Sequence, residues 1–465
     1  MVGRIKELAV PSFPAHVSGV FPHLAVTAGH VPRSETGIGA LMPWAEQLWF
    51  ITYPANPGQG FGHGLFSIDA GMNQEKHPQS VVGTYANRFI HRASDLLLIG
   101  PHLIDVEGEV RTVEPLVPHR LTATMAHLTD PENKVLYLTM AGLIYELDLH
   151  TLAVAQLFDL AQELDLGGVE HLHFKDAYTG QGRVFVAHNT YTERDYLHGP
   201  SQGRLSEWDG DAWTTIETCQ FNAVTGRTAI DDVVFAIGAD NASAILKVRA
   251  GGRWSTYRLP KGTHTQDHSW TTEWPRIREV ESERWLVDAS GLFYELPAMA
   301  YGGAVWGLRP ICTHLRIIGD YCAWRGLLVL AGDQTTPLWD SNPFCGQPQA
   351  NLWFGKTDDL WGFGRPTGWG GPWRKKRVRA GEHSDPFLMT GFGGKTLHLR
   401  HYAGRTVEFA VEVDFLGDQS WAPYDILRVP ARGYTYHVFP PGFSAHWVRL
   451  TAESDCTATA YLHYT

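Results

Sequence analysis

Cysteine is scarce in this sequence, and its spacing suits neither a metal site nor a disulfide framework. The chain has 465 residues and only five cysteines, which are Cys219, Cys312, Cys322, Cys345 and Cys456. They are widely spread and form no Cys-X-X-Cys pair, so a zinc site and a disulfide-rich secreted fold are not indicated. We therefore expect five reduced thiols in a reducing compartment.

Long apolar runs are absent as well. No window approaches the roughly 18 consecutive apolar residues that favour a membrane-spanning helix. The first residues, MVGRIKELAVPSFPAHVSG, lack the uninterrupted apolar stretch of a signal peptide. We expect no membrane association and a cytoplasmic location.

Basic residues are outnumbered by acidic ones. Lys and Arg total 38 against 49 Asp and Glu, and the net charge is −11. Neutralising many phosphates requires clustered Lys and Arg, so we expect no nucleic-acid partner. The single basic run, residues 374–379, is expected to be a solvated segment between domains. The same charge balance disfavours a polyanionic substrate.

Helical periodicity is almost absent, and residues 152–166 are the best candidate for a single helical turn. A pattern of apolar strand, turn and glycine-led strand recurs instead, about every 40 to 55 residues. Its apolar strands are 48–51, 96–99, 135–138, 184–186, 233–237, 285–287 and 327–330. Its later strands are 64–69, 102–105, 142–148, 203–209, 243–248, 291–296 and 351–355. Seven such units predict a seven-bladed β-propeller, whose stacked blades bury faces that one blade leaves exposed. A β-sandwich is the alternative, and it fits seven copies poorly.

The repeat stops near residue 370. The segments that follow alternate apolar and polar residues with a period of two: 397–400, 407–414, 434–439, 446–450 and 458–462. We predict an all-β protein with a propeller over 1–368 and a small antiparallel β-sandwich over 369–465, joined by 361–373. Residues 9–20 are expected to pair with the last blade and close the ring.

No short catalytic motif is present, so function is inferred from the expected geometry. There is no GxSxG, P-loop, HExxH or dinucleotide-binding glycine fingerprint. In a propeller, the loops leading into the innermost strands lie at one mouth of the central channel. Most of these loops carry His or Arg, as a site for a polyhydroxylated or carboxylated ligand, or a divalent metal, would require. For each histidine alone, a structural hydrogen-bonded role is the simpler interpretation. The turn at residues 320–325 is expected at the opposite face, with a structural role.

Glu273 is the leading catalytic candidate. It lies between Trp270 and Trp274, and an apolar environment would raise its pKa and suit it to general-acid catalysis. The alternative is that Glu273 forms an ion pair with Arg276 or Arg278. Glu170, Asp333 and His171 are the further catalytic candidates. The substrate-binding candidates are His119, Arg120, His173, His188, Tyr191, His268, Trp270, Arg276, His314, Gln349 and Trp353. We expect no required cofactor. A divalent metal bound by the channel histidines is the alternative.

With its blades, its His- and Arg-lined channel and its C-terminal sandwich, the chain resembles bacterial carbohydrate-active seven-bladed propeller enzymes. The likeness covers about residues 20–365 and is architectural, so it transfers no catalytic residue. It implies a glycoside hydrolase that uses two carboxylates on a small glycoside or oligosaccharide. A lyase with a His or Tyr base, and Arg or a metal neutralising a uronate, is the second alternative. A non-catalytic carbohydrate-binding propeller is the third.

Overall fold

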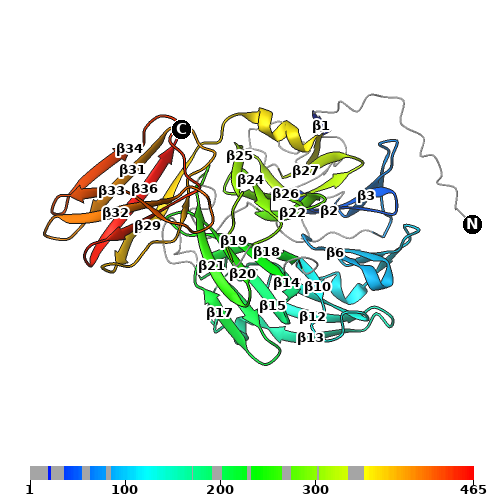
Figure 1. Ribbon diagram of the computed structural model, residues 1–465. Coiled ribbons are helices and arrows are strands. Elements are labelled where there is room, and N and C mark those ends of the chain that lie inside the picture. Colours follow the sequence, from blue (N-terminus) through cyan, green and yellow to red (C-terminus); the bar gives the residue numbers. More distant parts are fainter. Residues whose placement is uncertain are drawn as a thin grey trace, which may run out of the picture.

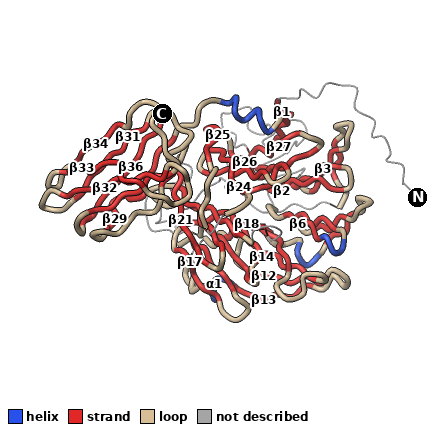
Figure 2. The backbone as a smooth tube through the Cα atoms, viewed as in Figure 1, coloured by secondary structure: helices blue, strands red, loops and turns tan. Residues whose placement is uncertain are grey.

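The computed structural model describes residues 19–21, 36–54, 63–79, 85–169, 171–190, 202–227, 232–263, 274–300, 303–333 and 350–465. Strands dominate these residues, and the helical segments are short, as Figure 2 shows. The prediction of an all-β protein is confirmed. The helical segments are η2 (Arg92–Ser94), η3 (Glu114–Leu116), α1 (Leu160–Glu163) and η4 (Thr357–Phe363). The turn of helix expected within 152–166 is α1.

The chain begins with antiparallel four-stranded sheets in which consecutive strands are neighbours. Sheet 1 contains β2 (Thr36–Trp44), β3 (Gln47–Pro54), β4 (Leu65–Ile68) and β5 (Gln74–Lys76). Sheet 2 contains β6 (Arg88–His91), β7 (Leu96–Ile99), β8 (His102–Ile104) and β9 (Val110–Thr112). Sheet 3 contains β10 (Leu121–Ala126), β11 (Lys134–Thr139), β12 (Leu143–Asp148) and β13 (Val154–Asp159). Sheet 4 contains β14 (Phe174–Gly180), β15 (Arg183–His188), β16 (Arg204–Trp208) and β17 (Trp213–Glu217).

Three further units continue the same strand order (Figure 1). Sheet 5 contains β18 (Gln220–Arg227), β19 (Val233–Ala239), β20 (Ala244–Ala250) and β21 (Arg253–Leu259). Sheet 6 contains β22 (Arg276–Glu281), β23 (Arg284–Ala289), β24 (Leu292–Pro297) and β25 (Arg309–Thr313). Sheet 7 contains β26 (Ile317–Trp324), β27 (Leu327–Asp333), β28 (Asn351–Gly355) and the N-terminal β1 (Gly19–Phe21). An N-terminal strand therefore does pair with the last sheet, at Gly19–Phe21, while residues 9–18 lie outside the described chain.

The first strands of consecutive sheets contact one another, and β2 also contacts β26, so these contacts return to sheet 1. Two glycines permit the close approach. A Cβ on Gly39 would lie 1.8 Å from the carbonyl oxygen of Tyr85, and one on Gly319 would lie 2.0 Å from that of Ile38. Neither distance is sterically possible, so only glycine fits where these backbones meet.

The expected position of Asp320 was wrong. It does not lie in a hairpin turn but inside β26, with its side chain fully buried, and the turn comes after Trp324. A buried carboxylate in a first strand requires charged partners, which are described below.

The C-terminal strands form two layers around a shared core. One is β29 (Gly368–Val378), β36 (Cys456–Tyr464), β31 (Lys395–His401) and β34 (Tyr434–Val438). The other is β30 (Phe387–Leu388), β35 (Trp447–Ala452), β32 (Val407–Asp414) and β33 (Ala422–Val429), and it continues sheet 5 because β30 pairs with β21. The basic run is thus largely part of β29; its exposure is confirmed, but its assignment to a linker is wrong.

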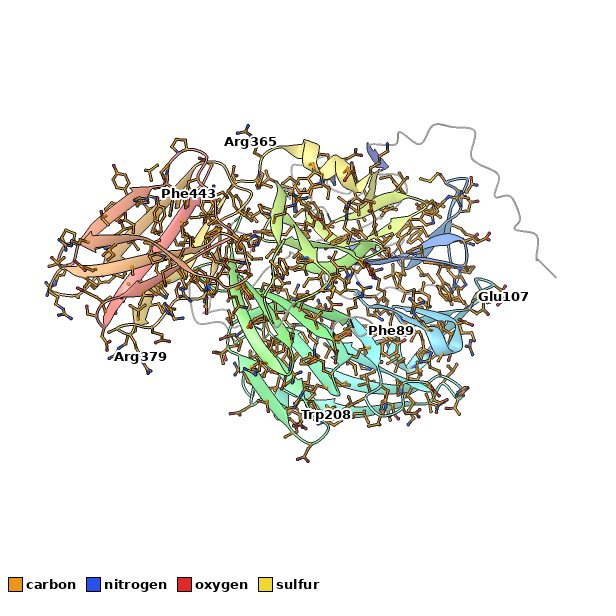
Figure 3. All side chains as sticks on the ribbon, in the orientation of Figure 1. Phe89, Glu107, Trp208, Arg365, Arg379 and Phe443 are labelled. Atoms are coloured by element: carbon orange, nitrogen blue, oxygen red, sulfur yellow. The ribbon has the colours of Figure 1, made fainter. Side chains whose placement is uncertain are left out.

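One continuous apolar cluster joins sheets 5 and 6 to the C-terminal strands. Trp447 packs on Tyr257 of β21 with ring centroids 4.7 Å apart. Arg258 connects the same two parts, with its Nε 2.8 Å from Asp385 and its Nη1 2.8 Å from Asp240. Figure 3 shows side chains filling the space between the sheets, with Trp208 at their rim and Phe443 in the C-terminal layers. The C-terminal strands are therefore held both by apolar packing and by the ion pairs of the buried Arg258.

Candidate ligand site between the first strands

Six first strands carry one extra residue relative to the neighbouring second strand. These residues are Gly39, Thr122, Lys175, Asn222, Val280 and Gly319. A β-bulge of this kind bends the strand and re-aims the extra side chain. The three polar ones, Thr122, Lys175 and Asn222, are at most 1% exposed. Buried polar groups require partners, so this row indicates a polar site between the first strands.

Trp274 lies where side chains from several sheets converge. It is 2% exposed and packs with Ala86 and Met140. Its indole Nε1 donates a hydrogen bond to the Tyr53 hydroxyl at 3.1 Å. The indole also accepts Lys175 over its ring face. Sheets 1 to 4 thus each supply or adjoin a residue in contact with Trp274.

Two buried cations face the Trp274 ring. Lys175 Nζ lies 3.8 Å from the ring centroid, and the Arg276 guanidinium carbon lies 5.0 Å from it. Cation–π attraction offsets part of the free-energy cost of burying these charges. Arg276 Nε donates to Gly319 O at 3.1 Å, and burial followed by Arg278 lowers the pKa of Arg276. Arg276 remains a cation, because no protein environment removes its proton near neutral pH.

Two buried residues of the first strands have donors without an internal acceptor. Arg276 Nη1 and both polar side-chain atoms of Asn222 are buried without a hydrogen-bond partner among the described residues. An unpaired buried donor costs about 1–3 kcal/mol, more when it is charged. Among the described residues, these donors therefore lack acceptor atoms, which a carboxylate or hydroxyl of a ligand would supply.

His173, directly before β14, joins this cluster to the two residues that follow β15. Its backbone N–H donates to Thr190 Oγ1 at 3.1 Å, and its Nδ1 lies 2.6 Å from Asn189 Oδ1. Burial, followed by the charges of Lys175 and Arg120, holds the pKa of His173 well below its usual value. His171 contributes in the same direction, so the predicted residues His171, His173 and Arg120 lie near one another. A histidine kept neutral in this way positions neighbours but is a weak proton acceptor.

Beside Arg276, two buried carboxylates meet three arginines. Asp320 lies 2.8 Å from both Arg88 and Arg278, and it accepts the Leu41 N–H at 3.0 Å. Burial opposes its ionisation, but Arg278 and Arg88 outweigh burial and lower the pKa of Asp320. Sheets 2, 6 and 7 are thereby connected through one carboxylate.

At Asp176, burial outweighs the nearby arginines, which is the opposite of Asp320. Asp176 accepts the N–H groups of Ala177 and Val224 at 3.0 and 3.1 Å, yet burial raises its pKa despite Arg276 and Arg278 nearby. Asp176 lines a cavity of about 200 Å³ that runs along the first strands of sheets 2 to 6. Its other polar lining residues include Asn87, Thr122, Thr124, Tyr178 and Arg278. A carboxyl with a raised pKa facing a polar cavity is a candidate proton donor.

Other predicted residues lie elsewhere. His119 packs on Tyr145 with ring centroids 4.8 Å apart, and Trp353 packs on Phe363 at 5.6 Å. Each ring is thereby held by a neighbouring aromatic, as expected of structural packing. The central cluster includes neither of them.

Two further predicted histidines occupy buried structural positions. His188 packs on Phe174 at 4.4 Å, and burial lowers its pKa to about 3, which makes it a poor general base. His314 Nε2 lies 3.0 Å from Asp288, and its ring packs on Phe293 at 4.5 Å.

The remaining candidates lie outside the described residues. These are Glu170, Tyr191, His268, Trp270, Glu273 and Gln349, together with the side chain of Asp333 at the end of β27. Arg276 is the predicted site residue that contacts the centre directly. Arg278, named as a partner of Glu273, forms an ion pair with Asp320.

Sequence reasoning missed Lys175, Asp176, Asn222 and Asp320. Lys175 and Asp176 stand together in an otherwise ordinary strand, and only the bulge makes both of them buried. The one signal in the sequence that could have indicated them was a pair of charged residues, Lys175 and Asp176, close to the apolar strand at 184–186.

The described residues contain no group of three or more His, Cys, Asp or Glu side chains able to hold a metal ion. In the same residues, no helix is long and apolar enough to cross a membrane.

Comparisons with known proteins do not assign the chain to a family. No family model matches the sequence, and no curated protein matches it. Among solved structures, a chain from a nidogen–laminin complex is 6% identical with a TM-score of 0.32, over 69% of this chain and 96% of that chain. The extracellular domain of a protein described as a putative one-component system of B. thetaiotaomicron is 7% identical with a TM-score of 0.42. It matches 96% of this chain, which spans 58% of its length. We draw nothing about function from either.

Proposed function

We propose that the chain is a seven-bladed β-propeller over residues 1–368 followed by a β-sandwich over 369–465, and that the propeller binds a carboxylated carbohydrate. The supporting observation for the fold is the succession of seven four-stranded units whose first strands contact one another back to the first. Such a ring is how propellers bury both faces of each sheet.

The ligand class follows from the charges around Trp274. Lys175 and Arg276 are buried cations, and Arg276 Nη1 lacks an acceptor among the described residues. A carboxylate pairs with such cations, while sugar hydroxyls suit the amide of Asn222 and the hydroxyl of Thr122. This balance favours a uronate, against the expectation from the net charge of the chain.

Carbohydrate cleavage is the activity we propose, with a lyase favoured over a hydrolase. In a lyase, a base removes the proton α to the carboxylate, the electron pair forms a C=C bond, and the glycosidic C–O bond breaks. The leaving oxygen takes up a proton from the protonated base or from water and departs as an alcohol. Cations that bind the carboxylate stabilise the charge of the carbanion-like transition state. Lys175 and Arg276 would take that role, and His171 is the candidate base.

Glycoside hydrolysis is the second mechanism, and Glu273 with Glu170 or Asp333 would carry it. The carboxylates of the described cluster fit it less well. Asp320 is fixed by Arg88 and Arg278, and both oxygens of Asp176 accept backbone N–H groups.

One assay separates these mechanisms. Purified protein is incubated with polygalacturonate, alginate and neutral amylose, while ultraviolet absorbance and reducing ends are measured together. A lyase raises absorbance in step with new reducing ends on a polyuronate, whereas a hydrolase forms ends without absorbance. Cleavage of amylose alone, or no cleavage and no binding of any uronate, would overturn the proposal.

A further inference from the structure

The C-terminal layer β29-β36-β31-β34 has one buried face and one exposed face. Residues alternate along its strands, so that Leu397 and Leu399 of β31 are buried while Arg400 is exposed. We call the exposed set the outer face. Its exposed and half-buried residues are Trp369, Arg377, Thr396, His398, Arg400, Tyr434, Tyr436, Val438, Thr457, Thr459, Tyr461 and His463.

The outer face displays aromatic rings side by side. Tyr434 and Tyr436 of the edge strand β34 are 53% and 61% exposed. Their centroids lie 6.4 Å apart with planes 25° from parallel, and His398 lies 6.0 Å from Tyr434 at 16°. His398 Nδ1 is 2.7 Å from the Tyr434 hydroxyl, which fixes that ring. The result is a row of nearly parallel rings, in which Tyr434 and His398 are joined by a hydrogen bond.

His463 extends this row across the sheet. It lies 5.1 Å from His398 and 5.8 Å from Tyr461 on its own strand, β36. Aromatic residues therefore span three strands, β34, β31 and β36, and cover an area larger than one sugar ring.

The charge of the outer face differs from that of the chain. The chain carries a net charge of −11, yet none of the outer-face residues is acidic. Arg377 and Arg400 are exposed there, and the Arg400 guanidinium carbon lies 5.1 Å from the Tyr402 ring. A basic face on an acidic protein favours an anionic partner, because other surfaces of the molecule repel it.

The chemistry of these side chains selects among anionic partners. Val438 is the single aliphatic residue of the outer face, so it lacks the apolar core of a protein interface. An acidic sugar chain suits these side chains. Aromatic rings stack on the C–H faces of sugars, hydroxyl groups hydrogen-bond to sugar hydroxyls, and the arginines pair with carboxylates. Two arginines are few for nucleic acid, whose backbone carries one charge for about every 1.7 Å of duplex.

We propose that the outer face binds an acidic polysaccharide chain, and that it tethers the protein to the polymer whose uronate units the first-strand site takes. The choice of a glycan rests partly on the proposed function. The existence of a second, basic and aromatic binding face rests on the C-terminal residues alone.

The test is electrophoresis of the full-length chain in gels containing polygalacturonate, alginate or hyaluronan, with amylose as a neutral polymer. We expect retardation by at least one acidic polymer and little by amylose. Tyr434→Ala with Tyr436→Ala should weaken that binding at least about tenfold, the loss expected for two aromatic contacts. Arg400→Gln should reduce its dependence on salt.

Two exposed residues of the opposite layer provide matched controls. Ile426 is 60% exposed and the Arg428 side chain 77% exposed, both on β33. Ile426→Ala with Arg428→Gln should bind the polymers like the parent protein. Equal loss in this control, no retardation by any acidic polymer, or tighter binding to duplex DNA would overturn the proposal.

A second measurement separates this proposal from the proposed function. Digalacturonate is too short to need a tether, so calorimetric binding to the first-strand site should be unchanged by Tyr434→Ala with Tyr436→Ala. Polymer retention without digalacturonate binding would reject the first-strand site and leave the outer face standing. Digalacturonate binding without polymer retention would do the reverse.

Discussion

The ammonium group of Lys175 lies 3.8 Å from the centroid of the Trp274 ring, although 98 residues lie between the two in the chain. The contact joins the first strand of sheet 4 to the segment just before the first strand of sheet 6. Lys175 reaches the Trp274 ring because it is the extra residue of a bulge in β14. The bulge interrupts the alternation of side chains between the two faces of the strand. The same bulge makes the neighbouring Asp176 a buried cavity residue.

The close approach of the first strands predicts a strict requirement for glycine. Gly39→Ala would place a Cβ 1.8 Å from the Tyr85 carbonyl oxygen, so the first strands must separate. We expect a loss of at least about 3 kcal/mol in the free energy of unfolding, the upper range for overpacking. The measurement is the midpoint of urea unfolding.

Gly404→Ala is the matched control, because no atom lies within 4 Å of the position that its new Cβ would occupy. Its midpoint should stay within the small range of surface substitutions. A Gly39→Ala protein as stable as this control would contradict the contact between sheets 1 and 2.

Asp320 is expected to matter more for stability than Asp176. Asp320→Asn leaves Arg88 and Arg278 with an uncharged partner, and breaking a buried pair costs about 3–5 kcal/mol. Folding lowers the pKa of Asp320, so its stabilisation is present above the unfolded pKa of about 3.9. This stabilisation is lost as the pH falls through the folded pKa.

Asp176→Asn should cost less, because burial raises the pKa of Asp176 and thus disfavours its charged form. Asp209→Asn is the exposed control, since its partner Arg183 is 3.6 Å away at the surface. Urea unfolding at pH 7 ranks the three variants. Equal midpoints for Asp320→Asn and Asp209→Asn would refute the role given to the buried network.

Two buried histidines make the protein sensitive to acid. Burial lowers the pKa of His102 to about 4 and that of His188 to about 3. The unfolded chain takes up protons below about pH 6.5 while the folded chain does not, so stability is full above that pH and falls on acidification. Between about pH 6.5 and 5 each histidine should cost about 2 kcal/mol.

His102→Gln should reduce this pH dependence, as measured by unfolding midpoints at pH 7 and 5. The parent protein provides the reference slope. Proton NMR that found either histidine titrating near its ordinary pKa of about 6.5 would disprove the explanation.

The described cysteines should behave as slow, reduced thiols. Cys219, Cys312, Cys322 and Cys456 are free, whereas Cys345 lies outside the described residues. Burial raises the pKa of both Cys312 and Cys322 to about 12, so little reactive thiolate forms at neutral pH. Ellman titration without reductant should find five thiols in denaturant and slow reaction of these two in the native protein. Fewer thiols than that would contradict the reduced state expected from the sequence.

The strands were predictable where their local pattern matches their environment. The glycine-led segments 64–69 and 291–296 correspond to β4 and β24, because a turn glycine followed by apolar residues needs no tertiary context. Strand β33 was not predicted, since its side chains are mostly exposed and carry little alternation. Strand β29 was hidden by its basic run, which covers an exposed edge.

The candidate site was harder to predict than the strands. Arg276 was identified from its place at the start of an inner strand, but Lys175 and Asn222 depend on bulges, which a period of two cannot reveal. Asp320 was assigned to a hairpin turn, whereas it lies inside β26. Its burial is explained only by arginines that are distant in sequence.

The most direct test of the central claim is calorimetric titration of digalacturonate into the parent protein and Lys175→Met. Methionine keeps the length of the side chain and removes its charge, so affinity should fall by about 10- to 100-fold, the worth of a charged hydrogen bond. Lys134→Met, which removes a lysine paired with Glu146 on sheet 3, should bind like the parent. Maltose should bind none of them measurably. Equal affinity for digalacturonate in the parent and Lys175→Met, or tighter binding of maltose than of digalacturonate, would contradict a carboxylate site at Trp274.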